Sequence, residues 1–497
     1  MNSDRKKLIK KIVFFTVLLT PLLFLIYLAA VSTDRVPSEI SSIRIPQGSP
    51  ALIEGKMYGI GKNRFRHSQS GLYELFVEGT PIEIGTYGGR LTKDLIVKQE
   101  KIFVSMLNRF LPGDLYRFLI KKFVLLFNKP MGEHVQPEYL HEIYGISASM
   151  ESDIAGIGSP YFRVLNYHAA HDIGHMVTNM NLVGCTAFAV WNSKSGSGDL
   201  ITGRNFDFFI GDRFAKDRIV AFVRPEKGIP FAMVTWGGMI GTVSGMNLSG
   251  LSVTLNAAKS GIPFRTATPV SLVAREILQY ADTVEKAFEI AKSRDIFVSQ
   301  MFFISSARDG KSAVIEKTPE MTELSYSGKD YFAITNHFTG KMKGTEKDQS
   351  SESMKMSQGR LNRVVELLEK REQFNVPMTV SILRDTKGYG DTNVEPGSEL
   401  AINQYLAHHS VVFNNTKRTM FVSTYPWQFG PYRAYELEKV FNEFPGMMND
   451  REISSSELTI PADPFMDTDE FRKVKRSRDD GTFKTDDIRF RKDGLNM

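Results

Sequence analysis

Residues 182–207 limit the possible folds of this chain more than any other stretch. They hold Gly184 and Cys185, the single cysteine of 497 residues, and continue with apolar and β-branched residues that alternate with period two. A serine- and glycine-rich segment then predicts a hairpin turn, after which a second strand returns. The hairpin would bring Arg204 and Asp207 back beside the cysteine. A thiol, a guanidinium and a carboxylate are thus expected at one end of two paired strands.

A lone cysteine argues against a disulfide framework and a thiolate metal cluster, because both need several cysteines. Two interpretations of Cys185 remain: a small buried hydrophobe, as most lone cysteines are, or a nucleophile. The preceding Gly184 favours a nucleophile, because a thiol can attack the carbonyl before it and glycine tolerates the strained backbone that this requires. Hydrolysis of the resulting thioester would free a new N-terminus. Its α-amine, with a pKa of roughly 7.7–8.0, could act as base for its own thiol.

Further motifs follow in order along the chain. They are Gly203-Arg-Asn-Phe-Asp207, Gly245-Met-Asn-Leu-Ser-Gly-Leu251 with Thr254-Leu-Asn256, Ile334-Thr-Asn-His337, Ser357-Gln-Gly-Arg360 and His409-Ser-Val-Val412. Together with Gly184-Cys185-Thr186 they resemble the N-terminal-nucleophile (Ntn) hydrolases of the penicillin acyltransferase type. This group is related to choloylglycine (bile salt) hydrolase, acid ceramidase and N-acylethanolamine acid amidase.

The resemblance implies a mixed α+β fold, a four-layer αββα sandwich, and self-cleavage between Gly184 and Cys185. It implies no cofactor and no metal. The catalytic residues that it implies are Cys185, Arg204, Asp207, Asn256, Asn336 and Arg360.

Each of these residues receives a role from the resemblance. Asp207 is expected to hold the freed α-amine, and Arg204 to lower the pKa of the thiol by proximity. Asn256 and Asn336 are expected to donate to the oxyanion, a contribution of roughly 2.7–4 kcal/mol per donor. Arg360 would hold the other site residues in place or bind a substrate carboxylate. Taken singly, Arg204 and Asp207 are explained as well by a salt bridge, and Asn256 and Asn336 by turns at the ends of strands.

Periodicity after the hairpin predicts further strands at 219–223, 231–235, 251–255, 301–305, 312–316 and 331–335, and helices at 270–280 and 283–292. A polar, lysine-rich segment at 340–357 predicts a mobile loop. The chain is expected to divide into a basic flank and membrane anchor (1–34), a linker and propeptide (35–184), a catalytic subunit (185–465) and a charged, disordered tail (466–497). The two self-cleaved fragments are expected to stay associated.

Residues 12–31 are uncharged and follow five basic residues. A membrane-spanning helix needs roughly 20 apolar residues, so this segment predicts a transmembrane anchor, with a cleaved signal peptide as the alternative. The basic flank predicts a cytoplasmic N-terminus and an exported catalytic domain on the periplasmic or other extracytoplasmic side. The apolar segment 115–129 carries four basic residues, so it suits either a core helix or a helix lying in the membrane interface.

His168, His171 and His175 share one face of a predicted helix, where they could bind a metal or, as we expect, pack beside the nucleophile strand. The net charge of +6 is spread along the chain, which argues against nucleic-acid binding. Three functions remain open. The first is hydrolysis of a linear N-acyl amide through an S-acyl Cys185, the second is transfer of that acyl group to an amine, and the third is an inactive membrane-tethered binding protein.

Overall fold

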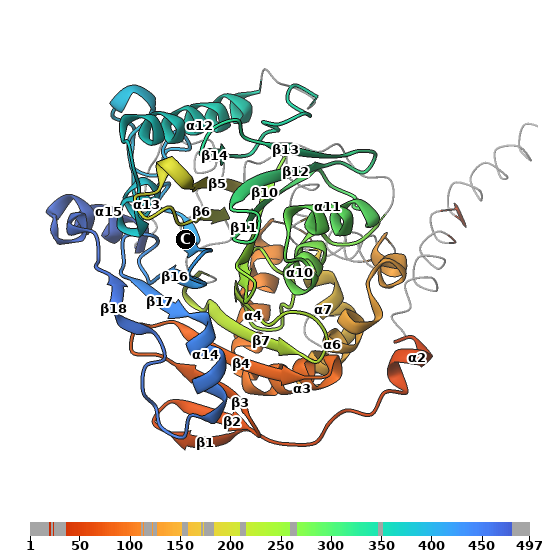
Figure 1. Cartoon of the computed structure of the whole chain (residues 1–497). Coiled ribbons are helices and arrows are strands. Elements are labelled where there is room, and N and C mark those ends of the chain that lie inside the picture. The colour runs from red at the N-terminus through yellow and green to blue at the C-terminus, as the bar shows by residue number, and fades with distance from the viewer. Residues whose placement is uncertain are drawn as a thin grey trace, which may run out of the picture.

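The computed structural model describes residues 19–20, 23, 36–110, 113, 122, 127–151, 158–169, 172, 183–208, 215–258, 266–345 and 351–479. Two β-sheets lie face to face, and helices cover the outer face of each sheet (Figure 1). The predicted mixed α+β fold is confirmed. Its layers run in the order helix, sheet, sheet, helix.

Sheet A has eleven strands within the described residues, in the order β1-β2-β3-β4-β7-β8-β9-β10-β11-β12-β13. The strands are β1 (Ala51–Glu54), β2 (Met57–Ile60), β3 (Asn63–His67), β4 (Tyr73–Gly79), β7 (Ile219–Pro225), β8 (Phe231–Thr235), β9 (Ser244–Asn247), β10 (Leu251–Ala257), β11 (Gln300–Ser306), β12 (Lys311–Lys317) and β13 (Thr322–Tyr326). Neighbouring strands are antiparallel except β4 and β7, which pair in parallel with Tyr73 opposite Ile219. Since β4 precedes Cys185 and β7 follows it, this sheet joins the predicted propeptide to the predicted catalytic part.

Sheet B has seven strands in the described residues, in the order β14-β5-β6-β15-β16-β17-β18. They are β14 (Tyr331–Ile334), β5 (Val183–Val190), β6 (Ile201–Phe208), β15 (Ala407–Asn414), β16 (Thr419–Ser423), β17 (Tyr432–Glu436) and β18 (Ser455–Ile460). Strands β5 and β6 form the predicted hairpin, with Cys185 opposite Phe206 and Gly184 opposite Asp207. The short 3-10 helix η2 (Asn192–Lys194) lies in the turn between them.

The helices on the outer face of sheet A are α3 (Pro81–Leu91), α4 (Lys93–Phe110), α6 (Pro137–Ser147), α7 (Pro160–His168), α10 (Val270–Tyr280) and α11 (Val284–Ser293). Helices α3 and α6 pack very closely. A Cβ atom on Gly85 would lie 2.1 Å from the carbonyl oxygen of Glu142, and one on Gly145 would lie 2.6 Å from the amide nitrogen of Thr86. Only glycine allows the two backbones to approach so closely.

Helices α12 (Glu352–Lys370) and α13 (Val376–Leu383) cover the outer face of sheet B, where Val364, Leu368 and Val380 pack against Phe188 and Val412. Apolar side chains of both sheets fill the space between them. They are Ala187 and Ala189 with Met301 and Phe303 beside β5, and Val220, Phe222 and Val234 with Val411, Phe413 and Val422 further along. The hairpin is therefore buried on both faces.

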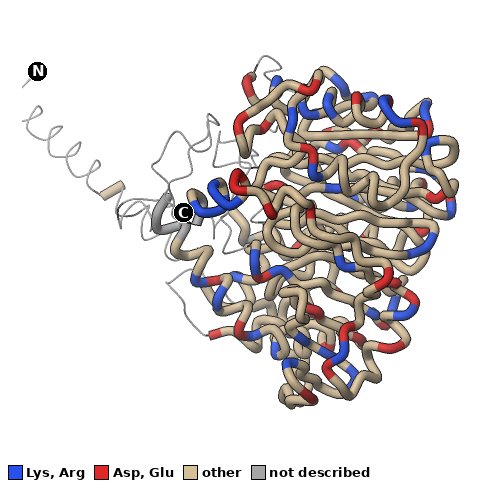
Figure 2. Tube along the Cα trace, turned by 90° about the vertical axis from the view of Figure 1, so that its left-hand side faces the viewer, with Lys and Arg blue, Asp and Glu red and all other residues tan. Residues whose placement is uncertain are grey.

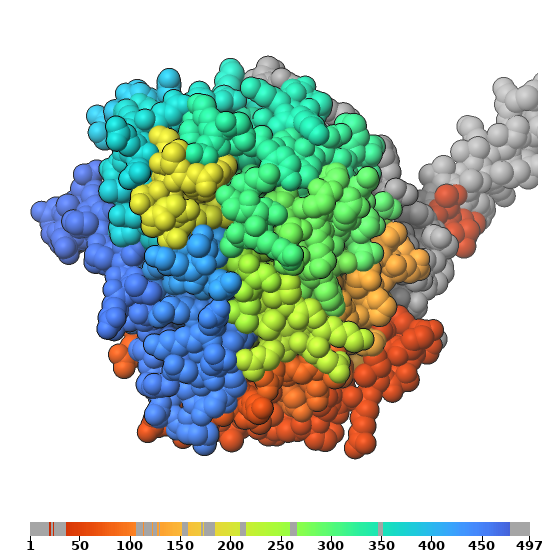
Figure 3. Space-filling model, viewed as in Figure 1, coloured from red at the N-terminus to blue at the C-terminus, as the bar shows by residue number. Residues whose placement is uncertain are grey.

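The remaining short elements are α2 (Ser38–Ser41), η1 (Lys129–His134), η3 (Tyr389–Asp391), α14 (Leu437–Glu443), η4 (Phe444–Gly446), η5 (Pro464–Asp467) and α15 (Asp469–Asp479). The C-terminal segment around η4 lies against the N-terminal strands (Figure 3). There Arg66 forms ion pairs with Glu74 at 3.1 Å and with Glu452 at 2.5 Å, and Arg64 Nε donates to the carbonyl of Met447 at 3.0 Å.

Two sequence predictions differ from this structure. The predicted disordered tail begins instead with α15, because Phe471 and Val474 are buried against Trp427 and Phe429. The predicted loop 340–357 ends in the first turns of α12, where Ser351 Oγ accepts from the amide nitrogen of Met354 and caps the helix. Residues 346–350 and 480–497 lie outside the described residues.

No helix among the described residues is long and apolar enough to cross a membrane. The predicted anchor at 12–31 lies almost entirely outside the described residues, as does most of the segment 115–129. Lys and Arg are interspersed with Asp and Glu over the described trace (Figure 2), in keeping with the small net charge of +6.

Candidate active site

Cys185 lies near the start of β5 and is fully buried. Its backbone nitrogen donates to Asn336 Oδ1 at 2.7 Å, and Arg204 Nη2 donates to its Sγ atom at 3.4 Å. Arg204 comes from the paired strand β6, whereas Asn336 follows β14 on the other side of β5. Both the nitrogen and the sulfur of the predicted nucleophile are therefore held by predicted site residues.

The guanidinium of Arg204 is fixed by strands β9 and β10 in the interior of sheet A. Its Nη1 atom donates to Ser244 Oγ at 2.5 Å and to the carbonyl of Val243 at 3.1 Å, and its Nη2 atom also donates to the carbonyl of Leu255. Burial lowers the pKa of Arg204, and the nearby Cys185 thiol opposes this shift. These bonds set the guanidinium in one position beside the sulfur.

Ser244 and His409 form a second buried layer behind Arg204. His409 Nε2 lies 2.8 Å from Ser244 Oγ and 3.4 Å from Arg204 Nη1, and its ring packs against Phe206 with centroids 5.2 Å apart. Burial, followed by the charge of Arg204, lowers the pKa of His409 well below its ordinary value, so the imidazole is neutral. The sequence singled out 409–412 only as a strand motif and assigned His409 no role.

The thiol of Cys185 has a raised pKa. Burial is the largest cause, the charge of Arg204 lowers the pKa, Asp207 raises it and Arg360 lowers it. Arg204 thus lowers the thiol pKa as predicted, but burial outweighs this contribution, so the pKa is raised overall. The thiol therefore needs a base to become a nucleophile.

Asn336 is the point where the site residues meet. Its Oδ1 atom accepts from the backbone nitrogen of Cys185 and from Arg360 Nη2, both at 2.7 Å, and its Nδ2 atom donates to the carbonyl of Ala257 at 3.1 Å. Arg360 Nη1 also donates to the carbonyl of Glu399 at 2.6 Å. The peptide nitrogen of Cys185 thus donates to Asn336, and the predicted contact of Asp207 with a freed α-amine stays a prediction.

Asn256 and Asp207 complete the set. Asn256 is the penultimate residue of β10 and donates through Nδ2 to the carbonyl of Thr335 at 3.0 Å, next to Asn336. Asp207 is buried opposite Gly184 at the end of β6. The structure therefore brings all six predicted side chains to one end of the hairpin, although three of them, Asn256, Asn336 and Arg360, come from elements far from the hairpin in the sequence.

Ser357 orders the backbone beside Asn336. Its Oγ atom accepts from the backbone nitrogen of Asn336 at 2.8 Å and lies 2.8 Å from His337 Nδ1. Burial, with a smaller contribution from Arg360, lowers the pKa of His337 to about 4. The Ser-x-x-Arg spacing thus has a local reason: one turn of α12 presents Ser357 and Arg360 on the same side.

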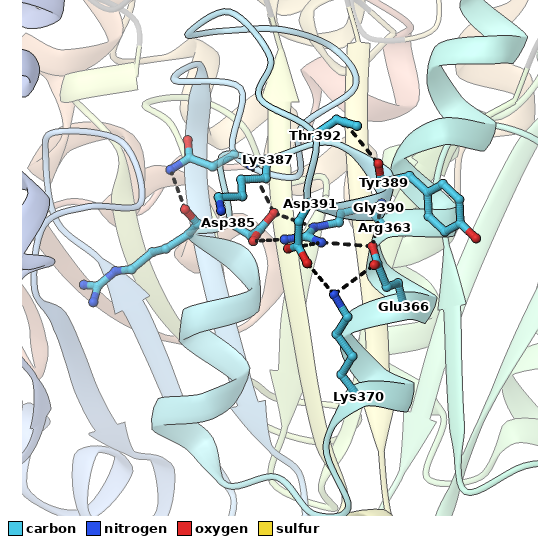
Figure 4. A network of polar contacts seen from close by, with 11 residues as sticks. Arg363, Glu366, Lys370, Asp385, Lys387, Tyr389, Gly390, Asp391 and Thr392 are labelled. Atoms are coloured by element: carbon cyan, nitrogen blue, oxygen red, sulfur yellow. Dashed lines mark hydrogen bonds and ion pairs between the residues drawn. The ribbon is translucent and has the colours of Figure 1, made fainter.

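A charged network holds α12 in place (Figure 4). Arg363, which is nearly fully buried, bonds to Asp385 at 2.8 Å, to Glu366 at 2.9 Å and to Asp391 at 2.8 Å, while Lys370 reaches Asp391 at 2.6 Å. These contacts tie α12 to the segment that follows α13. Because Arg360 lies one turn earlier on α12, the network also fixes the helix that carries it.

Gly184 lies in ordinary backbone, since it is not among the described residues with positive φ. That glycine tolerates the strained backbone of an attack on its carbonyl stays a prediction. A Cβ atom at this position would lie 2.6 Å from Gln404 Oε1 and 2.8 Å from Gln404 Nε2. Glycine is needed here because a buried side-chain amide occupies the space. No pattern in the sequence marks Gln404, which comes from a segment without regular structure.

His168 has a structural role. Its Nδ1 atom bonds to the carbonyl of Val164 at 2.7 Å, and its Nε2 atom accepts from the backbone nitrogen of Ile240 at 2.9 Å. Burial lowers its pKa to about 4. His171 and His175 lie outside the described residues, and within the described part of the chain no cluster of side chains could hold a metal ion.

Comparison with known proteins confirms the predicted resemblance. The family model for acyl-coenzyme A:6-aminopenicillanic acid acyl-transferase matches residues 191–399. This part of the chain is similar to that family. The matched residues include Arg204, Asp207, Asn256, Asn336 and Arg360. The match begins after Cys185, so it does not cover the predicted nucleophile.

An uncharacterized protein of Archaeoglobus fulgidus is 25% identical over 276 residues, which are 52% of this chain and 45% of that protein. The chain thus spans less than half the length of this relative. Three solved structures are also similar: a Caenorhabditis elegans ortholog of N-acylethanolamine-hydrolyzing acid amidase (18% identity, TM-score 0.35, 47% of this chain and 93% of that one), penicillin V acylase from Agrobacterium tumefaciens (14%, 0.31, 50% and 85%) and conjugated bile acid hydrolase from Clostridium perfringens (14%, 0.31, 51% and 93%).

Proposed function

We propose that this protein is a self-cleaving cysteine Ntn hydrolase that cleaves a linear amide bond of an N-acyl amide. The observation that carries the proposal is the pair of contacts at Cys185, with Arg204 Nη2 3.4 Å from Sγ and Asn336 Oδ1 2.7 Å from the backbone nitrogen. The matched acyltransferase family supports acyl chemistry in general.

Self-cleavage begins when Sγ of Cys185 attacks the carbonyl carbon of Gly184. An S-acyl bond forms, the carbon–nitrogen bond breaks, and the proton that the thiol loses passes to the departing nitrogen, so this step needs no free amine. Water then hydrolyses this thioester, which releases the Gly184 carboxylate and leaves Cys185 with a free α-amine. Asn336 Oδ1 already accepts from this nitrogen, so it can accept an N–H from the amine after cleavage. The amine supplies the base that the buried thiol lacks.

Turnover of the amide substrate repeats this chemistry. The α-amine takes the thiol proton, the thiolate attacks the substrate carbonyl, and the leaving amine departs with that proton. Arg204 stabilises the thiolate by charge. Asn256 and Asn336 each have a second amide N–H beyond the one bound to a backbone carbonyl, and these are the donors that we assign to the oxyanion. Water, deprotonated by the α-amine, finally hydrolyses the thioester and releases the acid.

N-terminal sequencing and intact mass of the purified protein test the self-cleavage. We expect fragments of 184 and 313 residues, the larger beginning at Cys185, and one uncleaved chain for Cys185→Ala. Incubation with an N-acyl amide followed by acid quenching should show an acyl mass on Cys185. Two fragments in Cys185→Ala, or an acyl group on another residue, would contradict the mechanism.

Acyl transfer is the second candidate, and the name of the matched family favours it. Hydrolysis and transfer share the S-acyl intermediate and differ in whether water or an amine resolves it. Adding increasing amounts of a primary amine during turnover distinguishes them. A hydrolase should keep releasing free acid, whereas an acyltransferase should divert most of the acyl group to the new amide.

We further propose that the two fragments stay associated and that residues 12–31 anchor them to a membrane. Association is supported by the parallel pairing of β4 with β7 and by the ion pair of Arg66 with Glu452, because both contacts cross the cleavage point. The uncharged segment after a basic flank supports the anchor. Both fragments should therefore co-elute under native conditions and remain on carbonate-washed membranes. Release of the smaller fragment would contradict the anchor.

A further inference from the structure

Gln404 touches the scissile junction, although it belongs to none of the predicted motifs. Its side chain is fully buried, and its amide occupies the place where a Cβ atom of residue 184 would lie, with Oε1 2.6 Å and Nε2 2.8 Å from that position. Contacts this short are essentially never seen for a real Cβ atom, so a larger residue at 184 would have to displace the amide.

The segment that carries Gln404 is held on both sides. The backbone nitrogen of Asn403 donates to the carbonyl of Asp385 at 2.8 Å, and its Oδ1 atom accepts from the backbone nitrogen of Tyr405 at 3.0 Å. Tyr405 packs against Trp427 and Phe429 in a buried aromatic cluster. Because the backbone is fixed and the side chain is enclosed, the amide cannot swing away without a cavity to receive it.

The self-cleavage intermediate and the substrate intermediate have the same bonds around the sulfur. In the first, the carbonyl carbon of Gly184 is bonded to Sγ of Cys185, and in the second the acyl carbon of the substrate is bonded to the same sulfur. The α-carbon of the substrate therefore takes the place of the Gly184 Cα atom. That atom carries one heavy substituent besides its carbonyl, as does the α-carbon of a linear acyl chain. A branch at the α-carbon, in the configuration that matches the Cβ atom of an L-residue, would take the position that faces Gln404.

We propose that Gln404 is a specificity-determining residue that restricts the site to acyl groups with an unbranched α-carbon. This inference rests on the proposed function, since it transfers the position of Gly184 to the substrate acyl group. It names the substrate class more closely: amides of linear carboxylic acids, and not of acids with a methyl or larger group at the α-carbon.

The first test uses self-cleavage alone. Gly184→Ala is introduced into the wild-type chain and into Gln404→Ala, and cleavage is followed on denaturing gels. The added methyl group should slow cleavage about ten-fold or more when Gln404 is present and have little effect in its absence. An equal effect of Gly184→Ala in both backgrounds, or no effect in either, would overturn the proposal. Wild-type chain that never cleaves would overturn the proposed function and this inference with it.

The second test uses two p-nitroanilides, one of a linear fatty acid and one of the same acid with an α-methyl group. Wild-type enzyme should prefer the linear substrate in kcat/KM, and Gln404→Ala should reduce that preference about ten-fold or more. Gln428→Ala is the matched control, because Gln428 is equally buried in a neighbouring segment, and it should keep the wild-type preference. Hydrolysis of both substrates at similar rates by the wild type would remove the role of Gln404 and leave the proposed function intact.

Discussion

Replacing Arg204 by Gln should raise the pKa of the Cys185 thiol. Burial already raises this pKa, and the charge of Arg204 is the largest contribution that lowers it. Loss of the charged group therefore shifts the pKa further upward, so at a given pH less thiolate is present. The only cysteine of the chain makes the effect directly measurable.

The size of the shift follows from the contacts of the guanidinium. Arg204 Nη2 donates to Sγ at 3.4 Å inside a fully buried site. A hydrogen bond to a charged group contributes roughly 1.5–3 kcal/mol. At about 1.36 kcal/mol per pKa unit, this corresponds to an increase of roughly one to two units. Arg360, which also lowers the pKa of the thiol, remains in the variant and opposes a larger change.

The assay is the pH dependence of alkylation by a small thiol reagent, followed by mass spectrometry under native conditions. The rising part of the rate profile should move to higher pH in Arg204→Gln. Arg218→Gln is the matched control, because Arg218 is similarly buried and donates to the carbonyls of Ala215, His408 and Ser423, away from the sulfur. Both variants should lose stability by leaving buried carbonyls without donors.

Three outcomes refute the explanation given for Arg204. The first is a profile that does not move, and the second is one that moves to lower pH. The third is an equal movement in Arg218→Gln, which would show that the shift reflects loosened packing around Cys185 and not the loss of a nearby charge.

Three further predictions follow from other contacts. Asn336→Ala removes the acceptor that Cys185 and Arg360 share, so self-cleavage should slow roughly ten- to hundred-fold on a gel time course, and an unchanged rate would exclude the positioning role. Burial raises the pKa of Glu74 to about 7, so the folded state binds this proton more tightly than the unfolded state does. The stability that the bound proton contributes is therefore lost as pH rises from about 4.5 through 7. Glu74→Gln should remove that part of the pH dependence of the thermal midpoint, and identical curves of midpoint against pH for both proteins would contradict this. Phe471→Ala should release α15 from its aromatic cluster and expose residues 464–479 to limited proteolysis at a cost of about 3 kcal/mol, whereas the exposed Arg472→Ala should leave the cleavage pattern unchanged.

The sequence by itself determined the elements whose signal is local. Period-two alternation predicted a hairpin over 182–207, and the structure pairs β5 with β6 so that Cys185 lies opposite Phe206 and Gly184 opposite Asp207. Helix α10 and strand β8 begin and end where periodicity placed them. Such features need only the residues of one segment and its turn, because side-chain direction repeats with the backbone. The six site residues were predicted from the resemblance of ordered motifs to a known family, and not from local periodicity.

Only the tertiary structure decided how those residues meet. Asn336, more than a hundred residues from Cys185, accepts from the backbone nitrogen of Cys185, a contact that no motif predicted. Gln404 fills the space beside Gly184 from a still greater distance in the sequence, and burial of the whole site raises the thiol pKa although Arg204 lowers it as predicted. Desolvation and close packing depend on every segment that surrounds a group, so no local pattern encodes them.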